Sequence, residues 1–250
     1  MTLQAISTKL EDWRYADPGA IEALEPAQLD AWQDIALAPG ETRTETLVLD
    51  DKATGLIRLR FDIGAGARAE IFAVLSASAY TRLEVEVRLA EGAHFELGGV
   101  TIGGGDAVRE IVTKANHHAP GATSQQVVRA VHWGQATGNF LGSIEVARGA
   151  QQTDAAQDFK GLLLEKGASA NAKPELEIFA DDVKCAHGAA IGALDEAARF
   201  YMASRGLPPA EAKRLLVRAF IADAFVAMAD ADKQHRMLEA ALVPLEDAAL

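Results

Sequence analysis

One short segment contains residue types that could bind iron or handle sulfur. Cys185 and His187 are two residues apart in the run ADDVKCAHGA, Ala180 to Ala189. In an extended strand, residues at this spacing point to the same face, roughly 6.6 Å apart along the backbone. Thiolate and imidazole are both ligands for iron or zinc, and a nearby imidazole can lower the pKa of a thiol. The pair therefore predicts a site at which both side chains act together.

This pair does not complete a metal site. Cys185 is the only cysteine in the sequence, and a tetrahedral site needs four ligands. Any metal bound at this pair would take further ligands from another chain or segment. A small buried core residue is the competing interpretation of Cys185, because free cysteines usually have that role. A cysteine–histidine hydrolase is a weaker alternative, because no third orienting group is recognisable.

The other chemically suggestive residues predict less. His117 and His118 precede a proline turn and are expected on a surface loop. Adjacent histidines on a strand would point in opposite directions and could not bind one metal. The glycine run 103–105 lacks the Gly-Lys-Ser/Thr ending of a phosphate loop, so this chain is not expected to bind ATP by itself.

Alternating apolar and charged residues predict half-buried strands around this segment. The clearest are 57–63 and 83–89, where every second residue is Ile, Leu, Val or Phe. Shorter strands are expected at 95–97, 110–113, 127–131, 143–146, 162–164 and 176–178. Their number and spacing indicate a mainly β protein.

Glycine–alanine steps recur between these strands at a spacing typical of stacked repeats. They begin at glycines 66, 92, 121, 149, 167 and 188, within the range of about 20 to 50 residues that characterises solenoids. A right-handed parallel β-helix fits this pattern best. An antiparallel sandwich remains the alternative, although two-residue Asn-Gly or Asp-Gly hairpin turns are scarce.

Helical segments are expected on both sides of the β region. Residues 3–35 show loosely helical spacing, and a helix over 194–204 ends before Gly206. Pro208 and Pro209 open a second helix that is expected to run to about Asp230, and a short last helix is expected over about 232–243. We therefore divide the chain into an N-terminal helical segment (1–39), a β-helix core (40–191) and a C-terminal helical region (192–250).

The second C-terminal helix is apolar around most of its circumference and needs cover on more than one side. Neighbouring elements of the same chain or another subunit could supply that cover. Phe220 and Phe225 are five residues apart, so they lie about 140° apart around a helix axis. We expect one of them to pack within this chain and the other to contact a partner.

The charge, the hydropathy and the cysteine content of the chain argue against several classes of partner and location. Acidic residues outnumber basic ones by 36 to 24, a net charge of -12, which repels nucleic acid and anionic membranes. No run of residues is apolar enough to span a bilayer, and the start of the chain does not resemble a secretory signal. With its single cysteine, the protein is expected in the cytoplasm.

The stretch from Thr153 to Gly206 resembles the shared core of the SufB and SufD family of iron-sulfur cluster assembly proteins. Its ordered motifs are a leucine-rich strand, LEI, ADDVKC, HGA, a helix with FY, and SRG. The upstream region 111–146, with FLGSIEV, is also similar to the family. The single cysteine and the form KCAHGA resemble SufD, although Ala186 stands where serine is common. The chain is also much shorter than the better known SufD proteins, and we expect it to lack most of their N-terminal helical domain.

This resemblance implies a non-catalytic scaffold subunit with a right-handed parallel β-helix. Such a subunit would pair with a SufB-like subunit through its β-helix and recruit a SufC-like ATPase through its C-terminal helices, near Phe220 and Phe225. It would hold no stable cofactor, but an iron-sulfur cluster could form transiently at the SufB interface, with His187 and Cys185 as interface residues and tentative metal ligands. A stand-alone β-helical enzyme acting on sugars or acyl groups, and a SufD-like homodimer, are the alternatives.

Overall fold

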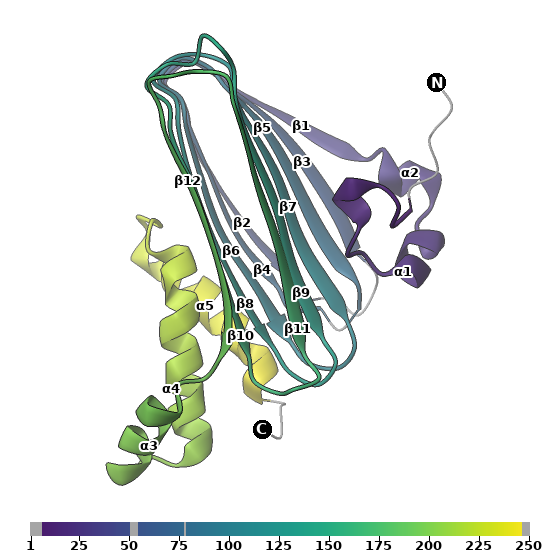
Figure 1. Ribbon diagram of the computed structural model, residues 1–250, viewed down its shortest axis with the longest axis vertical. Coiled ribbons are helices and arrows are strands. Elements are labelled where there is room, and N and C mark those ends of the chain that lie inside the picture. The colour runs from purple at the N-terminus through teal and green to yellow at the C-terminus, as the bar shows by residue number, and fades with distance from the viewer. Residues whose placement is uncertain (1–6, 51–54, 78, 247–250) are drawn as a thin grey trace.

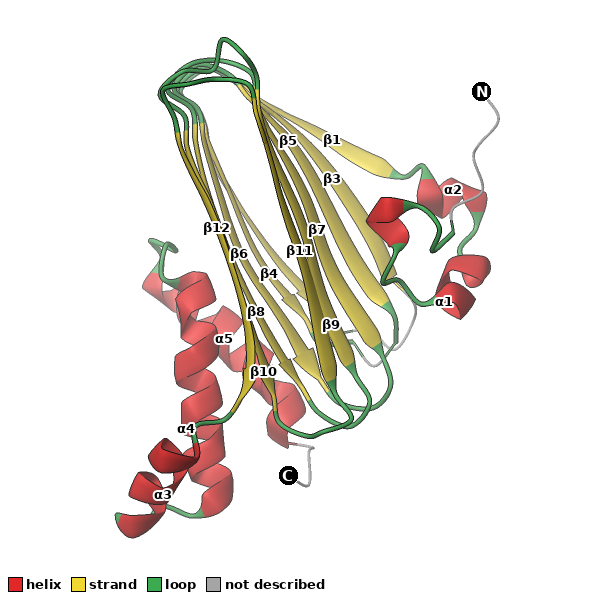
Figure 2. Ribbon diagram, viewed as in Figure 1, coloured by secondary structure: helices red, strands yellow, loops and turns green. Residues whose placement is uncertain are grey.

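Two parallel β-sheets form the centre of the molecule (Figures 1 and 2). The computed structural model describes residues 7–50, 55–77 and 79–246. The odd-numbered strands make up sheet A, which contains β1 (Trp32–Leu37), β3 (Gly55–Ile63), β5 (Thr81–Leu89), β7 (Val108–His117), β9 (Thr137–Val146) and β11 (Ser169–Ile178). The even-numbered strands make up sheet B, which contains β2 (Thr42–Leu49), β4 (Arg68–Leu75), β6 (His94–Gly103), β8 (Thr123–His132), β10 (Asp154–Leu163) and β12 (Lys184–Ala193).

The chain passes from one sheet to the other at every turn, so each coil adds one strand to each sheet. Neighbouring strands within a sheet are parallel and align residues 26 to 32 positions apart. This arrangement confirms the predicted parallel β-solenoid. The antiparallel sandwich is wrong, because the described strand pairs all run parallel.

The main core lies between the two sheets, where alternate side chains of each strand meet. Its members are mostly Leu, Ile, Val, Phe and Ala with little or no exposure. The Phe140 and Phe159 rings stack there with their centroids 5.9 Å apart. Burying each such aliphatic or aromatic side chain contributes about 1.5–3 kcal/mol. Stacked coils therefore stabilise one another along the solenoid.

The turns that lead from sheet A to sheet B also stack. Gly66, Gly92 and Gly121 have φ values of +63°, +64° and +68°, a conformation that glycine adopts readily. Each donates its N–H to a carbonyl of the next coil at 2.8–3.0 Å. The predicted stacking of glycine–alanine steps is confirmed at these positions. It is wrong for Gly188, which lies inside β12, and Gly167 belongs to a turn at the opposite end of the strands.

Short helical turns lie over part of the outer face of sheet A (Figure 1). They are η1 (Glu11–Trp13), α1 (Pro18–Ala23) and α2 (Pro26–Leu29). Of the expected helical region 3–35, residues 3–6 lie outside the described residues. The helical prediction is wrong at the other end of that region, where Trp32–Leu37 forms strand β1. Trp32 and Ile35 are three residues apart, which also fits a helix, but backbone pairing with β3 holds them in a strand.

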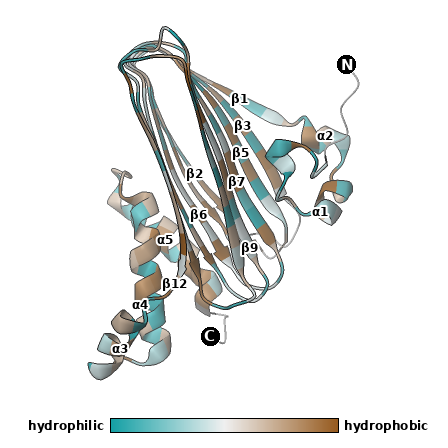
Figure 3. Ribbon diagram, in the orientation of Figure 1, coloured by the Kyte–Doolittle hydropathy of each residue, from teal (hydrophilic) through white to brown (hydrophobic). Residues whose placement is uncertain are grey.

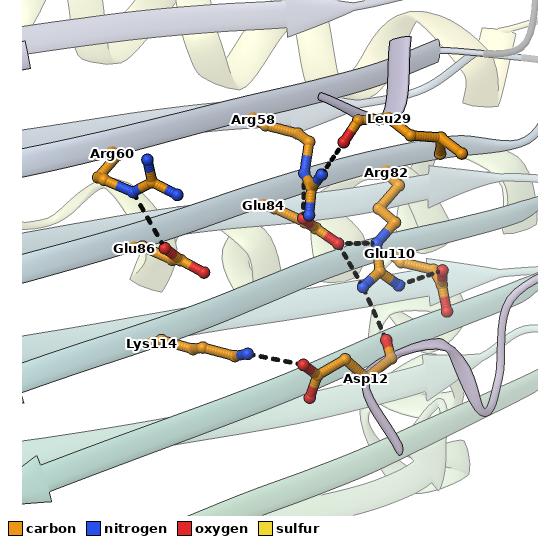
Figure 4. Close-up of polar contacts among 9 residues, drawn as sticks. All are labelled: Asp12, Leu29, Arg58, Arg60, Arg82, Glu84, Glu86, Glu110 and Lys114. Carbon is orange, nitrogen blue, oxygen red and sulfur yellow. Dashed lines mark hydrogen bonds and ion pairs between the residues drawn. The ribbon is translucent and has the colours of Figure 1, made fainter. Parts of the chain in front are cut away.

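An ion-pair network fastens this N-terminal segment to sheet A (Figure 4). Arg82 is fully buried and donates to Glu84 at 2.6 Å, to Glu110 at 2.9 Å and to the Asp12 carbonyl at 2.7 Å. The Trp13 ring stacks on its guanidinium at 3.9 Å. Because a buried charge is costly unless it is paired and hydrogen-bonded, this arrangement fixes where the segment lies.

Three further helices follow β12. They are α3 (Glu196–Ser204), α4 (Pro209–Ala222) and α5 (Ala231–Glu246), with the 3-10 turn η2 (Asp223–Phe225) after α4. The Asp195 side chain caps α3 by accepting two backbone N–H groups, and Gly206, with φ +85°, follows its end as predicted. Helix α4 is shorter than the expected extent to Asp230, because η2 turns the chain toward sheet B. None of these helices, nor any other in the described chain, is long and apolar enough to cross a membrane.

Helices α4 and α5 pack on the outer face of sheet B, opposite the N-terminal segment, and α3 contacts α4 (Figure 1). A second buried cluster joins outward-facing residues of β4, β6 and β8 to α4, η2 and α5. In Figure 3, α4 and α5 each carry both hydrophobic and hydrophilic residues, as amphipathic helices do. The backbones come very close at Gly98, where an added Cβ would overlap the Ala224 carbonyl oxygen. Glycine is therefore required at that position of β6.

Candidate functional site

Cys185 and His187 lie on β12, the last strand of sheet B. They align with Ala155 and Gln157 of β10, and Ala155 belongs to the core between the sheets. Both side chains of the pair therefore point to the inner side of the solenoid, at the end where no further coil of the described chain covers them. Cys185 is half-buried against the core, and His187 is exposed. The predicted placement of the pair on one face of a strand is what the structure shows.

The environment of Cys185 favours a neutral thiol. Burial raises its pKa, and the nearby Asp154 carboxylate raises it further, while a backbone hydrogen bond from Ala155 acts in the opposite direction. No nearby cation is among the causes of this shift. Because a thiolate is the form that attacks or binds metal, Cys185 needs a change in its surroundings, such as a bound metal or another subunit, before it can act as one.

A row of polar residues lies behind His187 on the inner face of sheet B. Gln126, Gln157 and His187 occupy equivalent positions on β8, β10 and β12. Gln126 accepts a hydrogen bond from Thr113 at 2.6 Å, but its Nε2 and both amide atoms of Gln157 have no hydrogen-bond partner among the described residues. Sequence reasoning missed these glutamines, although a polar residue at an inward-facing position of an alternating strand is the signal that could have found them.

Two histidines, His117 and His132, are buried. The sequence predicted a surface loop for His117 and no role for His132. The loop prediction is wrong for His117, which is the last residue of β7, points inward and contacts Ser124 Oγ at 2.9 Å. Burial lowers its pKa to about 4. His132 ends β8 on the same inner side, and burial, followed by the charge of Arg109, lowers its pKa to about 3. Only His118 of the predicted loop pair is exposed.

The two phenylalanines named as partner contacts have different surroundings. Phe225 is fully buried in the cluster that joins the helices to sheet B, so it is the member of the pair that packs within this chain and is not available to a partner. Phe220 is half-buried, with the Arg129 guanidinium 5.9 Å from its ring centre. It lines a groove of about 380 Å³ between α4 and the ends of β10 and β12. Far more exposed aromatic residues occur on α3, where Phe200 is 77% and Tyr201 is 59% exposed.

The edges of the last coil differ in how well they are protected. Strand β11 carries Lys173, Pro174 and Glu175, residue types that discourage pairing with another strand. Strand β12 has no proline, and apart from His187 it carries only small and apolar residues from Cys185 to Ala193. An edge of this kind is suited to pairing with a further strand.

The last coil does not supply enough ligands for a metal site at Cys185 and His187. Within residues 7–50, 55–77 and 79–246, no three His, Cys, Asp or Glu side chains are close enough together to hold a metal ion. Cys185 and His187 could therefore supply two ligands at most. The fold and the site define a parallel β-solenoid that presents a soft ligand pair on an unprotected terminal strand.

Comparison with known proteins identifies the family. A family model described as the SUF system FeS cluster assembly, SufBD core domain, matches residues 41–220. The chain therefore belongs to the SufBD family of iron-sulfur cluster assembly proteins, and its SufD-like character follows from its relatives.

These relatives resemble part of the chain. The iron-sulfur cluster assembly protein SufD of Escherichia coli is 35% identical over 126 residues, which is 50% of this chain and 30% of that protein. The chloroplastic protein ABCI7 of Arabidopsis thaliana is 46% identical over 105 residues, 41% of this chain and 22% of that protein. SufD of Bacillus subtilis is 30% identical over 132 residues, 53% of this chain and 30% of that protein. The matches thus span less than a third of the relatives' length.

Proposed function

We propose that this chain is a non-catalytic scaffold subunit of a SUF-type assembly complex and that it pairs with a SufB-like subunit through its last coil. The observation that supports this most directly is the unprotected edge of β12, which also carries Cys185 and His187. Pairing at this edge would bring the partner's side chains next to the incomplete ligand pair. An iron-sulfur cluster, as cargo, would then form between two chains.

The C-terminal helices are proposed to recruit a SufC-like ATPase. Helices α4 and α5 lie on the outer face of sheet B, away from the inner side on which Cys185 and His187 lie, and α3 is joined to them through α4. Phe200 and Tyr201 expose much of their surface on α3, and exposed aromatic residues are common anchors of protein interfaces. Phe220 would contribute from the edge of the same helical unit.

Pairing through β12 is tested with a charge placed on its edge. Ala186 is exposed and lies between the two site residues. Ala186→Lys should leave the melting temperature of the isolated chain within about 2 °C and weaken co-purification with a SufB-like subunit, because lysine on an edge strand discourages pairing. Ala186→Ser is the matched control and should bind normally. Equal binding by both variants would show that the partner docks elsewhere.

The role of the ligand pair is tested in the assembled complex supplied with iron and sulfide. His187→Ala should leave folding intact, because the residue is exposed, and should reduce cluster formation followed by visible absorbance. His235→Ala, which changes an exposed histidine on α5, should have no effect. If both variants form clusters as the parent does, His187 is not part of the assembly site.

A further inference from the structure

The solenoid contains three almost fully buried arginines, and one of them lacks a counter-charge. Arg82 is paired with two glutamates, and Arg129 with Asp158 at 2.5 Å and Asp223 at 3.2 Å. Arg109 is only 2% exposed, yet it makes no ion pair with any residue in the described parts of the chain. Its Nε and Nη1 are buried, and no described residue offers them a hydrogen-bond acceptor.

The surroundings of Arg109 are formed by four strands and a glycine turn. Arg109 is the second residue of β7 and aligns with Gly138 of β9. Its guanidinium lies against Gly103, whose φ is +147° and where an added Cβ would come within 2.5 Å of Nη2. At Gly138, an added Cβ would overlap the His132 ring. Glycines at both positions therefore leave room for the cation and for the imidazole beside it.

His132 does not neutralise this charge, nor does it add another. Its Nδ1 lies 3.1 Å from the Gly103 carbonyl oxygen and its Nε2 lies 3.1 Å from Thr101 Oγ1. The carbonyl can only accept, so Nδ1 carries the proton and Nε2 accepts from the threonine hydroxyl. Burial also keeps the pKa of His132 far below its usual value. The imidazole is a neutral wall of the site, and Arg109 supplies a single positive charge.

An uncompensated buried cation is unfavourable by several kcal/mol. Burial lowers the pKa of Arg109 only to about 10, so the side chain remains charged at neutral pH. We propose that Arg109, beside the glycine turn 103–105, binds a small monovalent inorganic anion inside the solenoid. One cation and a buried position favour an ion of halide size over a multivalent one, and the net charge of -12 repels a multivalent anion more strongly than a monovalent one.

Bromide is the probe, because it can be located by anomalous scattering. Thermal unfolding of the full chain is followed as sodium gluconate is replaced by sodium bromide at constant ionic strength. Ligand binding to the folded state alone should raise the melting temperature saturably, by about 3–6 °C at ten times the dissociation constant. Crystals grown with bromide should show an anomalous peak within hydrogen-bond distance of the Arg109 guanidinium.

Two variants separate binding from general effects of the salt. Arg109→Met should lose the bromide-dependent rise, and in gluconate it should melt no lower than the parent, since it removes an unpaired charge. Arg129→Met removes an arginine that is equally buried but paired, so it should melt at a lower temperature and keep the rise.

Three results would overturn the proposal. The first is a bromide response that Arg109→Met retains, and the second is the absence of any saturable response in the parent. The third is a bromide peak away from Arg109 or one seen without any response in solution, which would indicate an adventitious ion only. If Arg109→Met does not fold, the parent titration together with the anomalous map decides the matter.

Discussion

Truncation of Phe225 and of Phe220 should have clearly different effects. Phe225 is fully buried and lies in η2, which packs against β6 and β8. Removing a buried phenylalanine ring costs about 3–5 kcal/mol, through lost burial and the cavity left behind. For a protein of this size each kcal/mol lowers the melting temperature by about 2–4 °C. Phe225→Ala should therefore melt about 6–20 °C below the parent. The loss of about 3–5 kcal/mol is a large part of the total free energy of unfolding, which is typically about 5–15 kcal/mol.

Phe220 should give a smaller loss because part of its ring already faces solvent. It lines the groove beside β12, and its contact with Arg129 is at 5.9 Å, the outer limit for a cation–π interaction. Phe220→Ala should cost about 1–2 kcal/mol. If the helical unit binds the ATPase, this variant should also weaken SufC binding at a temperature where it remains folded.

Thermal unfolding by circular dichroism measures both losses, and a pull-down with the SufC-like subunit measures binding. Val226→Ala is the matched control, because this neighbour of Phe225 is 71% exposed and should melt with the parent. A Phe225→Ala loss no larger than that of Phe220→Ala would refute the packing described for η2. Unchanged SufC binding by folded Phe220→Ala would remove Phe220 from the docking surface.

Three other predictions test the packing and the titration of buried groups. Arg82→Met should lower the free energy of unfolding by about 3–5 kcal/mol by leaving the buried Glu110 carboxylate without a counter-charge, and adding Glu110→Gln should recover part of that loss in denaturant titrations. Gly98→Ala should destabilise by about 1–3 kcal/mol and make 223–230 sensitive to limited proteolysis, because the methyl group would overlap a carbonyl oxygen of η2; Gly149→Ala, with open space around it, should do neither. His132 has a folded-state pKa of about 3, below its unfolded value of about 6.5, so the unfolded state takes up the proton first. The contribution of His132 to stability should therefore be complete above pH 6.5 and fall by about 1.4 kcal/mol per pH unit below it, down to about pH 3. Because the pKa of buried His117 is also lowered, to about 4, His132→Asn should make the pH dependence of unfolding shallower and leave the share of His117.

The strands that were predicted well are those whose outer face is polar. Strands β3 and β5 alternate cleanly because their outward side chains are the charged residues of the network under the N-terminal segment. Strand β4 was missed because its outer face is covered by the C-terminal helices, so both faces are apolar and the alternation disappears. Strand β6 was predicted as only three residues, because Gly98 and Gly99 interrupt its pattern. The close approach of η2, which requires Gly98, could not be known from local sequence.

The candidate site also contains residues that could be predicted from the sequence and residues that could not. The Cys185 and His187 pair was visible because its spacing within one strand determines a shared face. Gln157 was not singled out, because its place behind His187 depends on the register between β10 and β12, which are 30 residues apart in sequence. Which of Phe220 and Phe225 packs inside could not be predicted, because the helix was expected to continue past Ala222, and the change to η2 turns the Phe225 ring into the core.

The distribution of unpaired polar atoms separates structural from functional polar residues in this solenoid. On the outer face of sheet A, the charges of Arg82, Glu84 and Glu110 are paired with one another. Of the buried side-chain atoms without a partner in the described residues, Arg129 Nε alone is on an outer face, and the others belong to inward-facing residues such as Arg109 and Gln157. Each such atom costs about 1–3 kcal/mol, and an apolar residue would fit the inner face of a strand without that cost. Their concentration inside the solenoid agrees with the anion proposed at Arg109 and with the partner proposed to pair at the open end beside His187.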